Sequence, residues 1–275
     1  MSVGSTFLKT WWDKFLDYRV KYFKNNVPRM EALPSRDEIF LSGGRITHGV
    51  VRVGNTVRRP RNAASSAVRS LLSHLEMKGF SAAPRYVGTD GQGRDIFTYI
   101  PGAIGKWQFY PDETIRLAGR LLRTFHDATI GSNLLLGKPV MCHHDPGPNN
   151  CVFQGTRPIA FIDFDMIAPG ERLEDLSYMA WSWCISAKES RQPVKTQARQ
   201  VGLLATAYGI DGVERHALFE SILERQTRNI QFWLGRKESS DSEADRKKID
   251  EMVEWTRKEQ AYTIANKSEF WKALA

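Results

Sequence analysis

The feature that most constrains the fold is a polar segment over 143–150, His-His-Asp-Pro-Gly-Pro-Asn-Asn, which lies between apolar runs. Proline and glycine restrict the backbone to irregular turns, so we expect a loop with a fixed shape. The loop offers the carboxylate of Asp145 and, five residues later, the amide of Asn150. A second carboxylate, Asp163, follows the apolar run 159–162. Polar groups held by a rigid loop and by the end of a strand indicate a functional site.

Phosphoryl transfer needs such a set of groups. One carboxylate orients or deprotonates the hydroxyl that accepts the phosphate. An asparagine oxygen and a second carboxylate are hard ligands for Mg²⁺, which neutralises charge on the transferring phosphate. Magnesium-dependent phosphoryl transfer is therefore the chemistry that these residue types favour.

A zinc site is the alternative, because the run 142–145 and Cys151 contain cysteine, histidine and aspartate, which are zinc ligand types. The spacing argues against it, since neither a Cys-x2-Cys nor a His-x3-His pair occurs in the run. We therefore favour magnesium chemistry over a zinc site.

The secondary-structure pattern divides the chain into three parts. Residues 1–35 form an N-terminal extension in which apolar residues at helical spacing predict an amphipathic helix. Residues 36–101 are rich in predicted strands, and Gly54-Asn55 between β-branched runs predicts a hairpin. Residues 102–275 are mainly helical. We expect an α+β fold with a small antiparallel-sheet N-lobe, a larger helical C-lobe and a cleft between them.

Apolar residues at helical spacing predict two amphipathic helices in these lobes, one near 66–77 and one that Asp112 is expected to cap. Ser240 and Glu243 are expected to form a capping box before the last long helix. The residues expected to face the core are Val68, Leu71, Leu72 and Leu75 in the first helix, and Ala118, Leu121, Leu122 and Phe125 in the second.

The catalytic-loop pattern of kinases, H-x-D-x4-N, matches this chain at 143–150. With the residues that follow, the segment resembles the aminoglycoside phosphotransferase and choline kinase group, which has the protein-kinase-like fold. The resemblance extends over roughly 37–235 and is strongest over 142–176. The residues that carry it are His143, Asp145, Asn150, the Ile-Asp-Phe at 162–164, Gly170, Asp175 and Leu176.

The resemblance implies a role for each polar residue of the segment. Asp145 is the implied catalytic base, and Asn150 and Asp163 are the implied Mg²⁺ ligands. His143 and Asp175 are implied to support the site structurally. The implied reaction moves the γ-phosphate of ATP or GTP to a hydroxyl of a small molecule, either an aminoglycoside-like antibiotic or a metabolite.

The resemblance also implies a nucleotide site in the N-lobe. The lysine that grips the phosphates is replaced by arginine, and Arg59 is favoured over Arg58 because it shares a strand face with Val57. The backbone at 97–102 looks like the hinge that holds the purine. The implied nucleotide-binding residues are Arg59, Arg58, Gly43, Gly44, Thr98 and Ile100.

Two further positions depart from the pattern of that group. The helix near 66–77 lacks an early glutamate to pair with the cation, because Glu76 lies near its end. Asp165 stands where aminoglycoside kinases often have glycine. These departures leave open a second function, that of a nucleotide-binding pseudokinase or regulatory module without turnover.

The composition argues against several other classes of protein. Apolar residues make up 41% of the chain, which excludes disorder throughout. No apolar run reaches the roughly 18 to 20 residues of a membrane-spanning helix, and no signal-type stretch is evident, so we expect a cytoplasmic protein. The three cysteines show no disulfide spacing.

The net charge of +8 is concentrated at the N-terminus, where residues 1–30 hold six basic and two acidic residues. A basic surface binder of nucleic acid or anionic lipid is therefore a third hypothesis, although no nucleic-acid module is recognisable. We expect the N-terminal helix to pack on its own domain or to mediate an oligomer contact. The expected partners are a nucleoside triphosphate and a small hydroxylated acceptor.

Overall fold

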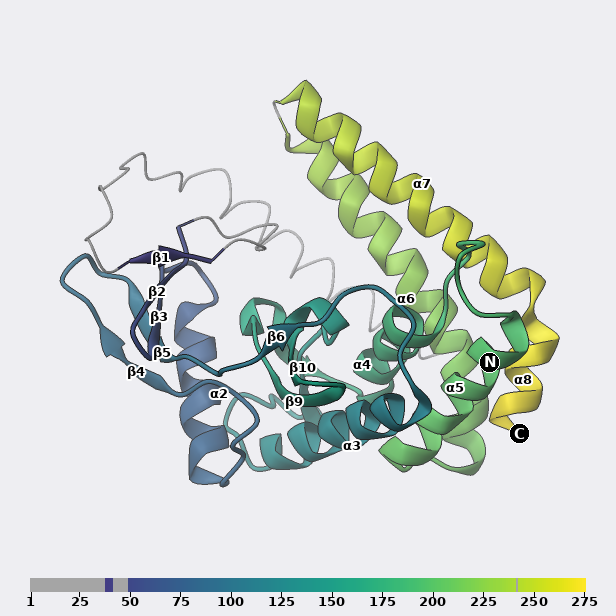
Figure 1. Cartoon of the computed structure of the whole chain (residues 1–275), viewed down its shortest axis with the longest axis horizontal. Coiled ribbons are helices and arrows are strands. Elements are labelled where there is room, and N and C mark those ends of the chain that lie inside the picture. Colours follow the sequence, from purple (N-terminus) through teal and green to yellow (C-terminus); the bar gives the residue numbers. More distant parts are fainter. Residues whose placement is uncertain (1–37, 42–48, 241) are drawn as a thin grey trace. The chain divides into compact units, whose positions relative to one another are not determined.

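The computed structural model describes residues 38–41, 49–240 and 242–275 (Figure 1). The helix predicted within 1–35, Gly43 and Gly44 lie outside the described residues. The described residues of Pro34–Arg225 form one compact unit together with Tyr262–Ala275, and Gln226–Ala261 belong to a second unit. All candidate site residues that the structure describes lie in the first unit.

A five-stranded antiparallel sheet forms the strand-rich region of the first unit, with strand order β1-β2-β3-β5-β4. The predicted hairpin joins β2 to β3, and Gly54 adopts a positive φ of 57° in its turn, which glycine tolerates without strain. The sheet strands are β1 (Ile39–Phe40), β2 (Val51–Val53), β3 (Thr56–Arg59), β4 (Tyr86–Thr89) and β5 (Asp95–Thr98).

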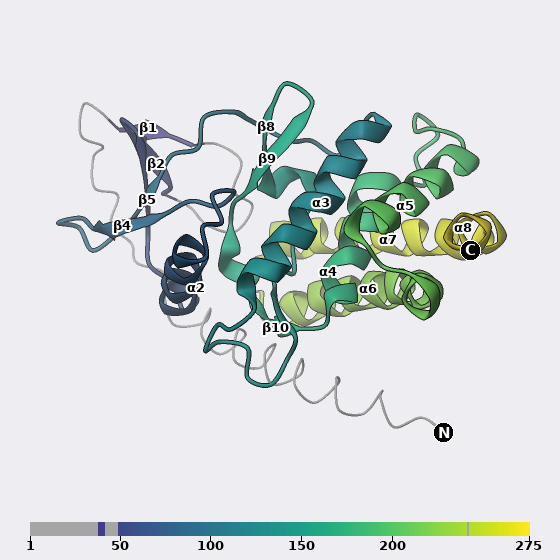
Figure 2. The ribbon, with the colours of Figure 1, turned by 90° about the horizontal axis from the view of Figure 1, so that it is seen from below.

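One helix, α2 (Ser65–Met77), follows β3 and lies beside the sheet (Figures 1 and 2). Its buried side chains are Val68, Leu71, Leu72 and Leu75, the face that the apolar spacing predicted. Burial of each such side chain contributes about 1.5 to 3 kcal/mol, which fixes the helix in one orientation. The sequence prediction of this helix and its core face is confirmed.

The rest of the first unit is mainly helical, and α3 (Asp112–Thr129) lies along α5 (Val194–Tyr208) at its centre (Figure 2). Gly119 makes this close approach feasible, because a Cβ there would lie 3.0 Å from the carbonyl oxygen of Leu204. The other helical elements of the first unit are α4 (Arg172–Met179), a π-helical turn at Ala180–Cys184, the first part of α6 (Gly212–Glu238) and α8 (Lys267–Leu274). The rest of α6 and most of α7 (Glu243–Ala265) belong to the second unit.

Two small sheets frame the polar loop of the C-lobe. β7 (Val140–Cys142), which precedes the loop, pairs with β10 (Ala168–Gly170). β8 (Cys151–Gln154), which follows it, pairs with both β6 (Ala103–Ile104) and β9 (Arg157–Phe161). The loop is therefore held at both ends by sheet hydrogen bonds.

Two predicted helix caps are wrong. Pro111 has the non-helical N-cap conformation of α3, and Asp112 is the first helical residue, because its carboxylate instead accepts hydrogen bonds from Arg199 and Gln200 of α5. α7 begins at Glu243, and the hydroxyl of Ser242, not Ser240, accepts a hydrogen bond from the main-chain N–H of Asp245.

Within the second unit, α6 and α7 are joined by polar contacts. Lys237 pairs with Asp250 at 2.6 Å, and the Asn229 amide donates to the Thr256 hydroxyl at 2.9 Å. In the part of the chain that the structure describes, no helix has both the length and the apolar character to cross a bilayer.

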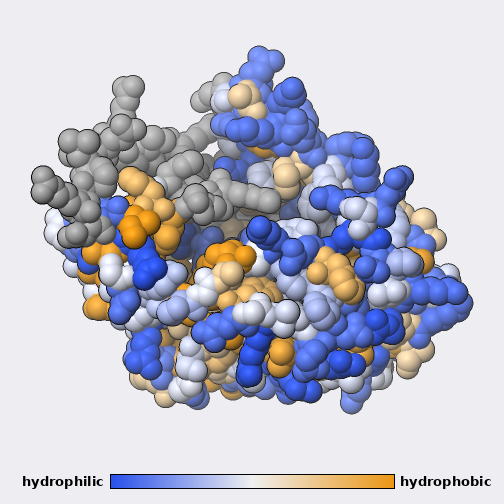
Figure 3. Space-filling model, in the orientation of Figure 1, coloured by the Kyte–Doolittle hydropathy of each residue, from blue (hydrophilic) through white to orange (hydrophobic). Residues whose placement is uncertain are grey.

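The surface shown in Figure 3 is mostly hydrophilic, with apolar side chains gathered over β1. Ile39 and Phe40 of this edge strand are each more than 60% exposed. The apolar core proper lies deeper, around α3, where Ile115, Leu122 and Phe125 are fully buried.

Candidate functional site

The polar loop is anchored by one buried carboxylate, that of Asp175 in the first turn of α4. Its Oδ2 accepts the main-chain N–H of His143 at 2.6 Å, and its Oδ1 accepts that of His144 at 2.7 Å. Hydrogen bonds from N–H groups to a carboxylate are stronger than those between neutral groups, so Asp175 holds the start of the loop in one conformation.

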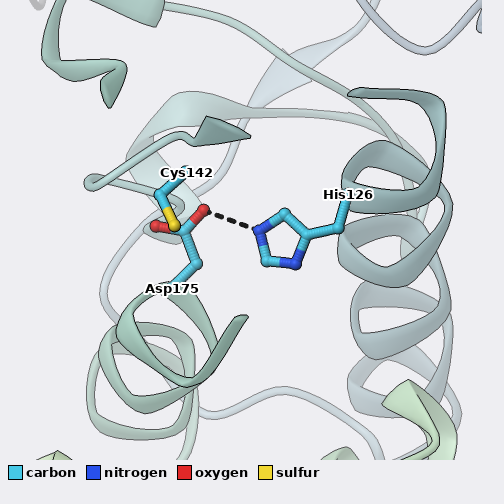
Figure 4. A group of neighbouring side chains, drawn as sticks. All are labelled: His126, Cys142 and Asp175. Carbon is cyan, nitrogen blue, oxygen red and sulfur yellow. Dashed lines mark hydrogen bonds and ion pairs between the residues drawn. The ribbon is translucent and has the colours of Figure 1, made fainter. Parts of the chain in front are cut away.

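A chain of buried side chains extends from Asp175 into the helical core. The Nε2 of His126, at the end of α3, lies 3.0 Å from Oδ2 of Asp175, and its Nδ1 lies 2.6 Å from the hydroxyl of Tyr208. Figure 4 shows the imidazole of His126 pointing at the carboxylate, with the thiol of Cys142 beside it. The conformation of the loop is thereby coupled to the packing of α3, α4 and α5.

The trio His126, Cys142 and Asp175 has the donor types of a metal site, with ligand atoms within 4.8 Å of one another. Its polar atoms are already engaged in hydrogen bonds, since Asp175 accepts three and His126 uses both ring nitrogens. The Cys142 thiol lies 3.3 Å from the carbonyl oxygen of Glu171. We therefore assign the trio to support of the loop, not to a metal.

Asp175 should make stability depend on pH in the acid range. Burial alone would raise the pKa of this carboxyl, but the hydrogen bond from His126 and the positive potential of the histidines lower it to about 2 from 3.8. Because the folded-state pKa lies below the unfolded one, the stabilisation is present above pH 4 and is lost as the pH falls toward 2.

We expect about 1 kcal/mol of the unfolding free energy to be lost from this residue between pH 6 and pH 3. Urea unfolding at a series of pH values checks the effect in wild type and in Asp175→Asn, which cannot titrate there. A free-energy difference between the two proteins that stays constant from pH 6 to pH 3 would contradict it.

His143 ties the loop to the end of β9. Its Nε2–H donates to the carbonyl oxygen of Ile162 at 3.0 Å, so its Nδ1 is the acceptor that faces the main-chain N–H of Asp145 at 3.3 Å. The main-chain N–H of Ile162 also donates to the carbonyl oxygen of Asn150 at 2.9 Å. These contacts bring Asp163, the residue after Ile162, beside the loop.

Asp145 and Asn150 are in direct contact. The Asn150 amide nitrogen donates to Oδ2 of Asp145 at 2.7 Å and to its carbonyl oxygen at 2.9 Å. Burial raises the pKa of the Asp145 carboxyl above its usual range, although the Tyr178 hydrogen bond and the electrostatic interactions with His143 and Arg225 act to lower it. A carboxylate whose pKa is raised is a stronger base than an exposed one.

Asp163 has a left-handed backbone conformation, with φ 62° and ψ 61°. This conformation is uncommon for a residue that is not glycine and is found preferentially at functional sites. His144, the residue before Asp145, also has a positive φ, of 60°. The Asp163 side chain is 43% exposed, so its carboxylate is accessible to a ligand from solvent.

Arg59 is the N-lobe cation that reaches this site. Its Nη2 lies 3.0 Å from Oδ1 of Asp163 and also contacts Oδ2 of Asp165. Arg58 precedes it in β3 and therefore points to the opposite face of the sheet. Of the two arginines considered from sequence, the structure places Arg59 at the site.

The hinge residues are placed by β5 and the chain that follows it. Thr98 ends β5, and its main-chain N–H donates to the carbonyl oxygen of Arg85 at 2.9 Å. Contact between its main chain and a purine would therefore have to use its carbonyl oxygen. The roles of Thr98 and Ile100 remain predictions.

Four residues near the site had no functional assignment from sequence. Arg225 donates to the carbonyl oxygen of His144 at 2.8 Å, and its guanidinium lies 4.5 Å from the ring centre of Tyr178. Trp107 donates to Oδ1 of Asn149 at 2.8 Å, and Asn62 donates to Asp165. Of these four, only Tyr178 could have been found from the sequence. It lies three residues after Asp175 on α4, a spacing that places two side chains on the same face of a helix.

The donor set of the site fits Mg²⁺. The Asn150 amide nitrogen donates to Asp145, so the amide oxygen is the atom that could bind a metal ion, and Asp163 adds an accessible carboxylate. Hard oxygen ligands of this kind are those that Mg²⁺ prefers. These two residues were also the metal ligands that the sequence resemblance implied.

Comparison with known sequences gives two matches. A family model described as "Phosphotransferase enzyme family" matches residues 128–219, which include the loop and Asp175. A trifolitoxin immunity protein of Rhizobium leguminosarum bv. trifolii is 33% identical over 212 residues, covering 68% of this chain and 80% of that protein.

Solved structures are similar in fold. A choline/ethanolamine kinase family protein from Mesorhizobium loti has a TM-score of 0.54 at 18% identity, covering 82% of this chain and 87% of that chain. A spectinomycin phosphotransferase, solved with ADP and spectinomycin, has a TM-score of 0.54 at 13% identity, covering 80% and 93%. The predicted two-lobed kinase-like fold is confirmed.

Proposed function

Since the chain belongs to the phosphotransferase enzyme family, we propose that it transfers the γ-phosphate of ATP or GTP to a hydroxyl group of a small molecule. The observation that carries the proposal is the contact of Asp145 with Asn150, beside Asp163. The 2.7 Å hydrogen bond holds the candidate base against Asn150, one candidate metal ligand. His143 ties the same loop to Ile162, the residue before Asp163, the other candidate ligand.

In the proposed reaction, Asp145 accepts the proton of the acceptor hydroxyl as its oxygen attacks the γ-phosphate, and the nucleoside diphosphate leaves. Asn150 and Asp163 would hold Mg²⁺, which would neutralise negative charge on the phosphates. Arg59 adds positive charge from the N-lobe side, and Asp175 keeps the loop in place. The 36–101 and 102–275 division into lobes is part of this proposal.

The acceptor is proposed to be a hydroxylated antibiotic or toxin, with a metabolite as the alternative. The name of the 33% identical relative, a trifolitoxin immunity protein, supports a role in protection from a toxin. The spectinomycin phosphotransferase of similar fold was solved with an antibiotic that its name identifies as the substrate. Phosphorylation adds negative charge and bulk, which can prevent a toxin from binding its target.

We propose a cytoplasmic location, where nucleoside triphosphates are available. Cys142, Cys151 and Cys184 are free thiols in the structure, a state that reducing compartments maintain.

The test is a phosphotransfer screen. The purified chain is incubated with Mg²⁺, ATP or GTP and a library of hydroxylated antibiotics and metabolites, and phosphorylated products are detected by mass spectrometry. We expect at least one acceptor to be phosphorylated in an Mg²⁺-dependent reaction, and Asp163→Ala to abolish it. Product formation that is unaffected by both chelation and Asp163→Ala would refute the proposed site.

A nucleotide-binding module without turnover is the second candidate. It is favoured by the contact of Arg59 with Asp163, in which a cation of the protein occupies a carboxylate assigned to the metal. This candidate predicts that nucleotide raises the melting temperature of the chain while no acceptor in the screen is phosphorylated. Turnover of any acceptor by wild type, lost in Asp163→Ala, would exclude it.

A further inference from the structure

We propose that Asp165 is the positioning residue for Arg59 and takes the place of the helix carboxylate that kinases use to orient their phosphate-binding cation. The inference rests on the proposed function, because it concerns the grip on the nucleotide. It adds a residue to the site for which the catalytic-loop pattern makes no assignment.

A long cationic side chain must be held before it can bind phosphate efficiently, since its rotamer freedom is otherwise lost on binding. Protein kinases solve this with an ion pair between the strand lysine and a glutamate of the neighbouring helix. Here α2 has one carboxylate, Glu76, and it pairs with Arg85 at 3.4 Å near the end of the helix. The helix therefore supplies no carboxylate to Arg59.

Asp165 supplies one from the other lobe. It lies in the 3-10 turn Phe164–Met166, which packs against α2. Its Oδ2 contacts Nη2 of Arg59 and accepts the Asn62 amide at 2.6 Å. Asn62 is itself fixed at the start of α2, because its Oδ1 accepts the main-chain N–H of Ala64 at 2.9 Å. Asp165 thus joins Arg59 to a fixed point of the N-lobe.

The two carboxylates that contact Arg59 differ in exposure. The Asp165 side chain is 15% exposed, equal to that of Arg59, whereas that of Asp163 is 43% exposed. An ion pair shielded from water is screened less than an exposed one. We therefore assign Asp165 as the partner that Arg59 keeps when nucleotide binds. Asp163 is the carboxylate that releases Arg59, so that Asp163 can bind the metal and Arg59 can bind the nucleotide.

These different roles of Asp165 and Asp163 predict how loss of Asp165 should change nucleotide binding. Removing the Asp165 carboxylate leaves the contact of Arg59 with Asp163 in place, so the cation would stay on the metal ligand. Nucleotide with Mg²⁺ would then have to displace it. Loss of Asp165 should weaken nucleotide binding through Arg59, with little effect on the affinity for the acceptor.

The test is a double-mutant cycle on the affinity for Mg·ADP, measured by isothermal titration calorimetry with wild type, Asp165→Ala, Arg59→Ala and the double variant. We expect each single substitution to raise Kd by about tenfold or more, the effect of losing one charge-assisted hydrogen bond. The double variant should be no weaker than Arg59→Ala alone by more than about twofold, because the two residues act as one unit.

Asp165→Asn guards against a folding defect, since it keeps the side-chain volume and one acceptor oxygen, and its Kd should lie between those of wild type and Asp165→Ala. Arg85→Ala is the matched control, because it breaks an ion pair of the same lobe away from the site, and its Kd should equal that of wild type.

Two results would overturn the inference while leaving the proposed function intact. One is a fold-change in Kd for the double variant that equals the product of the two single fold-changes, and the other is an unchanged Kd in both Asp165 variants. Absence of nucleotide binding by wild type would overturn both.

Discussion

Replacing Asp145 with asparagine is expected to lower kcat for phosphotransfer by about 10² to 10⁴, the usual contribution of a general base. An amide has nearly the same shape as the carboxylate, and its oxygen can still accept the hydrogen bond from Asn150. Basicity is therefore the property that the substitution removes. Initial rates with the acceptor found in the screen, at saturating nucleotide, measure the effect.

Asp250→Asn is the control for this prediction, because Asp250 is an exposed aspartate that pairs with Lys237 on α6. It should leave kcat unchanged. The affinity of Asp145→Asn for Mg·ADP should stay within about threefold of wild type, since uniform binding is separate from the chemical step. Wild-type kcat in Asp145→Asn would show that Asp145 is not the base.

Asp175→Asn is expected to cost about 3 to 5 kcal/mol of unfolding free energy, the usual cost of breaking a buried charged pair. The carboxylate accepts two main-chain N–H groups and His126 in a site with no exposure. An amide has a single acceptor oxygen, and its NH₂ group would face one of those donors. Urea unfolding followed by circular dichroism measures the difference.

Asp127→Asn is a matched control for Asp175→Asn. Asp127 follows His126 on α3 and pairs with Arg172 of α4 at 2.8 Å, so both aspartates join the same two helices. The Asp127 pair is partly exposed, and its loss should cost about 0 to 1 kcal/mol. Similar losses in both variants would mean that Asp175 acts as an ordinary ion-pair residue and does not anchor the loop.

Local pattern was sufficient for several elements of the fold. The buried face of α2 was predicted residue by residue, because the 3.6-residue period decides which side chains share a face. The hairpin at Gly54-Asn55 was predicted because its turn requires a positive φ. The cap predicted at Asp112 was wrong, because its carboxylate accepts hydrogen bonds from α5, a partner that the local sequence does not reveal. The cap predicted at Ser240 was wrong, because α7 begins at Glu243 and the nearer hydroxyl of Ser242 accepts the main-chain N–H in its first turn.

The candidate site also has features that the sequence determined and features that only the tertiary structure decided. By itself, the sequence determined the types and spacing of Asp145, Asn150 and Asp163, since short loops and strand ends limit where such groups lie. Only the tertiary structure decided the partners of Asp175 and Arg59. Asp175 accepts a hydrogen bond from a loop residue 31 positions before it, and Arg59 contacts a carboxylate 106 residues away. A periodic pattern shows which face of an element is buried but not which element covers it, so contacts across the lobes depend on packing of the whole unit.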